Sequence, residues 1–292
     1  MRFIYYQGLP TLADYGIEIP VLDTRATRTI EELRSHPRMR SFFDEHLITS
    51  RAETITKEDM LRAHDNGYIE RITELDRAGA LYDAYELLDE HGEFQRYDPS
   101  GAKYPLEELF DVVLTWTSGT LHCMREAVSN AFCFYFAGGF HHAHYGFGHG
   151  FCMINDIVIG IRKLQAEGLI ETAWVIDGDA HKGDGTAAIT RDDPSIRTLS
   201  IHMAKGWPLS RFPLDSNGKL HPSFIPSDVD IPIPAGRENE YETRLREGLM
   251  QLDEYPRPDL AVVLFGADPY VRDHLESAKL LRLSLAQMKD RD

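Results

Sequence analysis

The apolar residues of this chain gather in short continuous runs that are separated by longer segments of mixed character. Five of these runs predict β-strands, at Arg2–Tyr6, Ala131–Ala137, Ala173–Asp177, Ile196–His202 and Leu260–Gly266. Because most positions in these runs are apolar, rather than every second one, the strands are typical of a sheet that is buried on both faces.

Segments with a helical spacing of apolar residues lie between the predicted strands. They predict helices at Thr29–Arg34, Lys57–Glu74, Glu107–Val128, Asp156–Glu167 and Glu240–Leu252. Thr29 with Glu32, and Thr56 with Asp59, have the spacing of capping pairs at helix starts. The alternation of strands and helices indicates an α/β fold with a central, mainly parallel sheet flanked by helices. No repeat or long linker divides the chain, so we expect a single domain over residues 1–292.

The charge balance excludes some classes of partner. The chain has 31 Lys and Arg residues against 47 Asp and Glu residues, a net charge of −16. This charge opposes binding to phosphate backbones, so we expect no nucleic-acid partner. The apolar runs are far shorter than the roughly 20 residues that cross a bilayer, and Met1–Pro10 lacks the features of a secretory signal. Three cysteines cannot all pair, which fits a reducing compartment, and we expect a cytoplasmic protein without a membrane segment.

Acidic residues and a histidine cluster at the end of the predicted strand Ala173–Asp177. Asp177, Asp179 and His181 occupy alternate positions, so an extended backbone would project all three side chains from one face. Carboxylates and an imidazole on one face can hold a divalent metal, and Asp268, after another strand, could add a ligand. Two Asp and one His would leave an open coordination position, which is typical of a catalytic site. On the motif alone, structural hydrogen bonds remain the alternative.

The tandem residues His141 and His142 follow two glycines at the end of the predicted strand Ala131–Ala137. Aspartates that are not needed as metal ligands could pair with each histidine, fixing its tautomer and raising its basicity. His144 and His149 lie in the same segment, so a histidine-rich metal site or a flexible loop remains a competing interpretation.

Four segments, from about Thr56 to the C-terminus, resemble the histone deacetylase superfamily, which includes acetoin-utilisation proteins and acetylpolyamine amidohydrolases. They are ITKEDMLRAHDNGYIERI, GGFHHA with GFCMINDIVIGI, VIDGDAHKGDGT and LFGADPYVRD, and they occur in the family's order. The DAHxG pattern of the third segment is closest to the class IV branch. The resemblance implies the arginase/deacetylase-like version of the α/β fold.

The resemblance also implies roles for the polar residues. It implies three Zn²⁺ ligands, Asp179, His181 and Asp268, with Fe²⁺ as the alternative ion. It pairs Asp177 with His141 and Asp184 with His142. The family uses its second histidine as the general base, which is His142 here, while His141 would assist electrostatically.

Further residues match the family's channel and its second ion site. Gly150 and Phe151 match positions that line the narrow channel for the acyl-lysine arm, although Phe151 could simply fill the core. Trp207 could form another part of the channel. The family also binds a structural monovalent cation, K⁺, which here would use oxygens of Asp177, Asp179, His181, Ser200 and Ile201.

The resemblance implies a zinc-dependent amidohydrolase that removes an acyl group by means of metal-activated water and a histidine base. Its substrate would be N-acetyl-lysine in a protein or peptide, or an acetylated small amine. The family supplies a transition-state tyrosine from a later Gly-Gly-Tyr segment. We expect the chain to lack that segment, because LLRLSLAQMKDRD resembles the stretch before it.

Two other functions remain open at this point. A non-catalytic acyl-lysine binder or regulatory protein would not need the tyrosine, although it would have no need of a general base either. A binuclear manganese ureohydrolase of the arginase type has a similar fold. That family reads DAHxD where this chain has Asp179-Ala180-His181-Lys182-Gly183, so a ligand for its second metal is missing.

Overall fold

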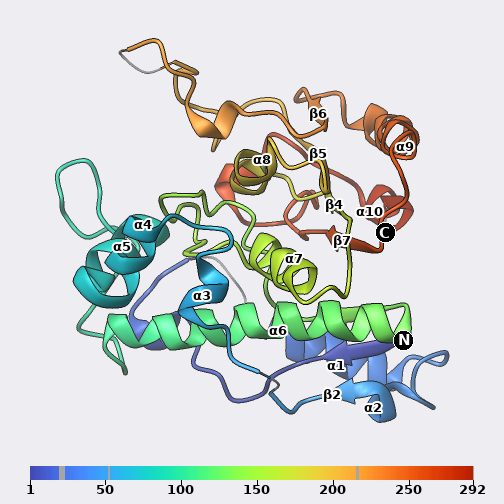
Figure 1. Cartoon of the computed structure of the whole chain (residues 1–292), viewed down its shortest axis with the longest axis horizontal. Coiled ribbons are helices and arrows are strands. Elements are labelled where there is room, and N and C mark those ends of the chain that lie inside the picture. The colour runs from blue at the N-terminus through green and yellow to red at the C-terminus, as the bar shows by residue number, and fades with distance from the viewer. Residues whose placement is uncertain (20–23, 52, 215–216, 292) are drawn as a thin grey trace. The chain divides into compact units, whose positions relative to one another are not determined.

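The computed structural model describes residues 1–19, 24–51, 53–214 and 217–291 (Figure 1). Its backbone contacts divide the chain into two compact units. Unit 1 comprises Met1–Phe140 and Gly146–Leu169, and unit 2 comprises His141–Tyr145 and Ile170–Asp292. Each unit has its own parallel sheet, and the single domain stays a prediction. None of the helices that the structure describes combines the length and the apolar character needed to span a membrane.

Unit 1 contains a three-stranded parallel sheet in the order β2-β1-β3. Its strands are β1 Arg2–Ile4, β2 Leu47–Ile48 and β3 Cys133–Tyr135. The long helix α6, Leu109–Asn130, packs on β1 and β3 and also against α7, Asp156–Ala166 (Figure 1). The remaining α-helices of unit 1 are α1 Arg25–Ser35, α2 Phe43–His46, α3 Lys57–Met60, α4 Asn66–Glu70 and α5 Arg77–Tyr85.

Unit 2 contains a four-stranded parallel sheet in the order β6-β5-β4-β7. Its strands are β4 Ala173–Asp177, β5 Ile196–Met203, β6 Val229–Ile233 and β7 Leu260–Leu264. Its α-helices are α8 Asp184–Thr190, α9 Tyr241–Leu252 and α10 Leu285–Arg291 (Figure 1).

Helices cover both faces of the unit 2 sheet. Gly248 of α9 lies so close to the sheet that a Cβ there would be 3.3 Å from Leu199 Cδ1 of β5. On the next strand position, Ser200 Oγ accepts a hydrogen bond of 3.4 Å from the backbone N–H of Gly183, which directly precedes α8. Since successive strand residues point to opposite faces, α9 and the start of α8 lie on opposite sides of β5.

The predicted α/β fold with parallel strands and flanking helices is confirmed, but the described strands form two sheets instead of one central sheet. All five predicted strands are present, and Ala173–Asp177 matches β4 at both ends. Strands β2 and β6 were not predicted. Burial on both faces is confirmed for β5, whereas it is wrong for β7, in which Val263 is 54% exposed.

Two helix predictions differ from the structure. The predicted helix Lys57–Glu74 is wrong as one element, because α3 ends at Met60 and a new helix, α4, begins after Asp65. The Asp65 side chain caps α4 by accepting the N–H of Tyr68, and a π-helical turn, Arg71–Leu75, follows α4. The capping box of Thr56 and Asp59 is confirmed.

The predicted cap at Thr29 is wrong. Helix α1 begins four residues earlier, at Arg25, and its preceding residue Thr24 makes no side-chain capping bond. Thr29 lies inside the helix and donates its hydroxyl to the Arg25 carbonyl at 2.8 Å. A threonine with this spacing to an acidic residue therefore also occurs within a helix, where its hydroxyl bonds the preceding turn.

Candidate functional site

The segment that follows β4 is bent rather than extended. Strand β4 ends at Asp177, whose Oδ1 accepts the backbone N–H of Asp179 at 3.0 Å. Asp179 Oδ1 in turn accepts the N–H of His181 at 2.9 Å. Two successive side-chain-to-backbone turns of this kind redirect the chain at each aspartate. The prediction that the three residues share one face of an extended strand is therefore wrong, although they lie in one site.

Asp179, His181 and Asp268 form a compact cluster. His181 Nδ1 lies 3.1 Å from Asp179 Oδ1 and 2.9 Å from Asp268 Oδ2. Asp268 follows β7, the neighbour of β4 in the sheet, and its Oδ1 accepts the N–H of Ala180 at 3.2 Å. The potential ligand atoms all lie within 4.8 Å of one another. The structure thus brings together the three predicted metal ligands from two neighbouring strand ends.

The electrostatics of this cluster fit a divalent cation. Burial, followed by the negative charge of Asp179, raises the pKa of Asp268 to about 6. Burial alone would lower the pKa of His181, but its bonds to Asp179 and Asp268 raise it to about 10. Two buried carboxylates that repel each other, with an imidazole nitrogen between them, form a donor set suited to a metal ion. His181 Nε2 lies 3.1 Å from Ser277 Oγ, a partner that orients the ring.

His141 forms a buried pair with Asp177. Its Nδ1 lies 2.6 Å from Asp177 Oδ2, and both side chains are almost fully buried. Burial alone would lower the pKa of His141, but the charge and hydrogen bond of Asp177 raise it to about 9. The predicted rise in basicity is therefore confirmed for His141, which carries a positive charge at neutral pH.

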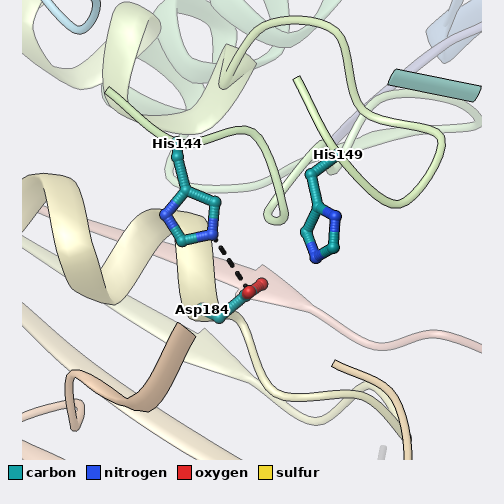
Figure 2. A group of neighbouring side chains, drawn as sticks. All are labelled: His144, His149 and Asp184. Atoms are coloured by element: carbon teal, nitrogen blue, oxygen red, sulfur yellow. Dashed lines mark hydrogen bonds and ion pairs between the residues drawn. The ribbon is translucent and has the colours of Figure 1, made fainter. Parts of the chain in front are cut away.

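His142 forms a corresponding pair with Asp184, at 2.7 Å between Nδ1 and Oδ1. The other carboxylate oxygen of Asp184 lies 3.0 Å from His144 Nε2, the interaction that Figure 2 marks. Burial, followed by the positive charge of His141, lowers the pKa of His142 to about 3 despite Asp184. Asp184 raises the basicity of His142 as predicted, but burial and His141 outweigh this effect, so the ring is neutral at neutral pH.

The start of helix α8 holds Asp184 against the histidine segment. The N–H of Thr186 donates to the His141 carbonyl at 2.9 Å. A Cβ on Gly185 would lie 2.4 Å from the Ala143 carbonyl oxygen, so only glycine allows this close approach. Because the backbones are in direct contact, the Asp184 side chain at the start of α8 reaches His142.

Trp207 lies beside both histidines of the site. Its ring is roughly perpendicular to those of His142 and His181, with centroid distances of 4.5 and 5.5 Å. The structure therefore places Trp207 with the cluster of candidate metal ligands and with the His142–Asp184 pair. Gly150 and Phe151 belong to unit 1, where both have positive φ, of 56° and 64°. Their role in a channel stays a prediction.

The residues predicted to hold the monovalent cation are also neighbours in unit 2. Asp177 at the end of β4 is paired in register with Ser200 of β5, and Ile201 follows. Ser200 and Ile201 are buried, and Asp179 and His181 come directly after β4. The ion itself stays a prediction.

An ion pair of the buried Lys182, which adjoins the candidate ligand His181, was not predicted. Lys182, which follows His181, is 4% exposed and places Nζ 3.0 Å from Asp230 Oδ1. His202 Nε2 lies 3.4 Å from the other oxygen of Asp230. Burial alone would raise the pKa of Asp230, but His202, Lys182 and the Ser227 N–H lower it to about 2. Neither residue was assigned a role from the sequence, because their pairing joins two distant segments of the chain.

The comparisons with known proteins point to one family. The model of the histone deacetylase domain matches residues 20–291. An uncharacterised protein of Picosynechococcus is 34% identical over 163 residues, which cover 56% of this chain and 50% of the relative. A probable deacetylase of Archaeoglobus fulgidus is 24% identical over 91% of this chain and 69% of its own length. The acetoin utilization protein AcuC of Bacillus subtilis is 29% identical over 47% of this chain and 35% of its own.

Solved structures share the fold. A homologue of histone deacetylases from Aquifex aeolicus superposes with a TM-score of 0.66 at 22% identity, covering 99% of this chain and 74% of that one. A second homologue, complexed with SAHA, gives 0.63 at 23% identity, covering 94% and 71%. The chain thus spans between about one third and three quarters of the length of these relatives.

Proposed function

The chain belongs to the histone deacetylase family of hydrolases, and from this premise we propose that it is a metal-dependent deacylase. Its substrate is the amide of an acylated amine, N-acetyl-lysine in a peptide or an acetylated small amine. One observation carries the proposal: the cluster of Asp179, His181 and Asp268 lies beside His142, with 5.9 Å between the ring centroids of His142 and His181.

The metal would be held by Asp179, His181 and Asp268, with Zn²⁺ as the proposed ion and Fe²⁺ as the alternative. When bound, it polarises the amide carbonyl and lowers the pKa of the attacking water. A second, structural ion, K⁺, is proposed at the oxygens around Asp177 and Ser200, which adjoin each other across β4 and β5.

His142 acts as the general base in this proposal. Its Nδ1–H donates to Asp184, so the lone pair is on Nε2. Because the pKa of His142 is low, the ring is neutral at pH 7 and can accept a proton as water attacks the amide carbon. The same nitrogen then returns the proton to the leaving amine. His141, charged through Asp177, stabilises the negative charge that develops on the amide oxygen.

Aromatic surface next to these residues would receive the acyl group and its alkyl arm. Trp207 packs edge-on to His142 and His181 and remains partly exposed, so one side of its ring can contact methylene groups. By resemblance to the family, Gly150 and Phe151 are proposed to line the channel for the acyl-lysine arm.

The test is hydrolysis of an acetyl-lysine peptide and of acetylspermidine by the zinc-loaded chain. His142→Ala should reduce turnover by roughly 10²- to 10⁴-fold while zinc content stays at the wild-type level. His36→Ala, at an exposed position of unit 1, is the matched control and should leave turnover unchanged. Equal turnover in the His142 variant would exclude this mechanism. Peptide binding without turnover at full zinc occupancy would indicate the alternative, a non-catalytic acyl-lysine binder.

A further inference from the structure

Arg291, on the last turn of α10, is a buried cation that donates to the ends of two neighbouring strands. Its side chain is 8% exposed. Nη1 donates to the carbonyl of Gly178 at 3.1 Å and to the carbonyl of Gly266 at 2.8 Å. Gly178 immediately precedes the proposed ligand Asp179, and Gly266 lies two residues before Asp268.

Arg291 bonds the two segments at the point where the backbone hydrogen bonds between β4 and β7 end. The backbone pairing of β4 with β7 runs to Asp177 and Leu264, and the N–H of Gly178 donates to the Leu264 carbonyl at 2.8 Å. Beyond this bond the segments after β4 and β7 no longer form a regular ladder. The guanidinium of Arg291 instead bonds one carbonyl of each segment, at Gly178 and Gly266. One charged donor that bonds two carbonyls fixes the separation of the two strand ends.

Packing holds the guanidinium in place. Its central carbon lies 4.6 Å from the centroid of the Phe265 ring, in a cation–π arrangement. The same ring closes over Gly178, where a Cβ would lie 2.7 Å from its edge and 3.3 Å from Tyr241 Oη. The Phe265 ring therefore contacts both Arg291 and Gly178, the residue that precedes the proposed ligand Asp179.

The separation of the strand ends matters because two carboxylates converge there. A Cβ on Gly266 would lie 2.1 Å from Asp179 Oδ2 and 2.7 Å from Asp268 Oδ1. The two carboxylates repel each other and both lie within 3.1 Å of His181 Nδ1, so their spacing depends on the backbone that carries them. A fixed bridge between the carbonyls at Gly178 and Gly266 holds that backbone in place.

We propose that Arg291 is a positioning residue that preorganises Asp179 and Asp268 for a divalent metal. Its hydrogen bonds to the carbonyls of Gly178 and Gly266 act on the backbone that carries the two ligands. The inference rests on the proposed metal site, but it does not depend on the substrate or on hydrolysis. Loss of the bridge should weaken metal binding by roughly 10- to 100-fold, the usual effect of removing a group that orients metal ligands.

The test measures Co²⁺ binding by the full chain, from the visible absorption of the bound ion and from competition with a chelator. Arg291→Met keeps an unbranched, largely apolar side chain but has no donor. Arg291→Lys keeps the charge and can reach one carbonyl, so its dissociation constant should lie between those of wild type and Arg291→Met. The control is Arg282→Met, which removes another arginine that donates to a backbone carbonyl, that of Val271. This control should bind Co²⁺ as the wild type does.

The outcomes separate this inference from the proposed function. Weaker Co²⁺ binding and an altered absorption spectrum in Arg291→Met, with cooperative unfolding retained, support the role of Arg291. Wild-type affinity in a folded Arg291→Met overturns it. If Arg291→Met does not fold, Arg291→Lys decides, and affinity equal to that of Arg282→Met overturns the inference. A wild-type chain that binds Co²⁺ without hydrolysing amides refutes the deacylase alone, whereas one that binds no Co²⁺ overturns both.

Discussion

His144 Nε2 lies 3.0 Å from Asp184 Oδ2, on the carboxylate whose other oxygen bonds His142 (Figure 2). Asp184 is fully buried, and its pKa is held well below the usual range; burial opposes this, but the bonds to the two histidines outweigh it. A buried carboxylate bonded at both oxygens has little freedom to rotate, so His144 helps to fix the orientation of His142.

We predict that His144→Phe lowers kcat by about 10- to 100-fold with a much smaller change in KM. The phenyl ring removes the second donor to Asp184, so the carboxylate can turn away from His142. His144→Gln restores a donor and should recover part of the loss. Steady-state kinetics of the zinc-loaded variants checks this, and an unchanged kcat in His144→Phe would show that Asp184 orients His142 without help.

The low pKa of His142 has a direct spectroscopic consequence. Burial and the charge of His141 disfavour its protonated form, and a bound cation adds to the same effect. We predict that its imidazole stays neutral from about pH 8 to about pH 5, below the ordinary histidine value of about 6.5. Nitrogen NMR of the zinc-loaded protein measures this, with His142→Gln to identify the signal. Titration near pH 6.5 would contradict the prediction.

The ion pair between the buried Lys182 and the partly buried Asp230 predicts a pH-dependent loss of stability. Lys182→Met leaves Asp230 without its ammonium partner, and we expect the free energy of unfolding to fall by about 2–4 kcal/mol at pH 7. The pKa of Asp230 is about 2, below its ordinary 3.8, so its contribution is present above pH 3.8 and is lost as the pH falls through 2. The difference between variant and wild type should therefore narrow in acid.

Urea unfolding of the metal-free proteins at several pH values checks this prediction. The control is Lys57→Met, which breaks an exposed ion pair with Glu74 and should change stability by less than about 1 kcal/mol. Equal effects of the two substitutions at pH 7, or a constant difference in stability between variant and wild type down to about pH 2, would contradict the role assigned to the Lys182–Asp230 pair.

The apolar pattern predicts some elements of the fold better than others. It predicts β4 at both ends, because its first four residues are apolar and the ionisable Asp177 closes it. It does not predict β6, where Asp230 and Pro232 interrupt the run, although the strand pairs in register with β5. Local pattern also predicts one helix over Lys57–Glu74, because the break before α4 depends on a cap made by Asp65.

The candidate site is partly predictable for a physical reason. Ligand-type residues at the carboxyl ends of parallel strands meet at one edge of a sheet, so Asp179, His181 and Asp268 could be grouped from sequence. The residues that orient these three side chains could not be identified from their position after a strand. Ser277 and Arg291 reach the site from segments that fold back on it, and their contacts depend on the tertiary structure.

The most direct test of the account is a titration of the metal-free chain with Zn²⁺, with acetate release from an acetyl-lysine peptide measured at each ratio. We predict that turnover rises in proportion to zinc, levels off at one ion per chain, and is abolished by Asp268→Asn but not by the exposed control Asp253→Asn. Turnover that persists without metal would contradict the account. Turnover that requires two ions per chain would also contradict it and would point to a binuclear hydrolase of the arginase type.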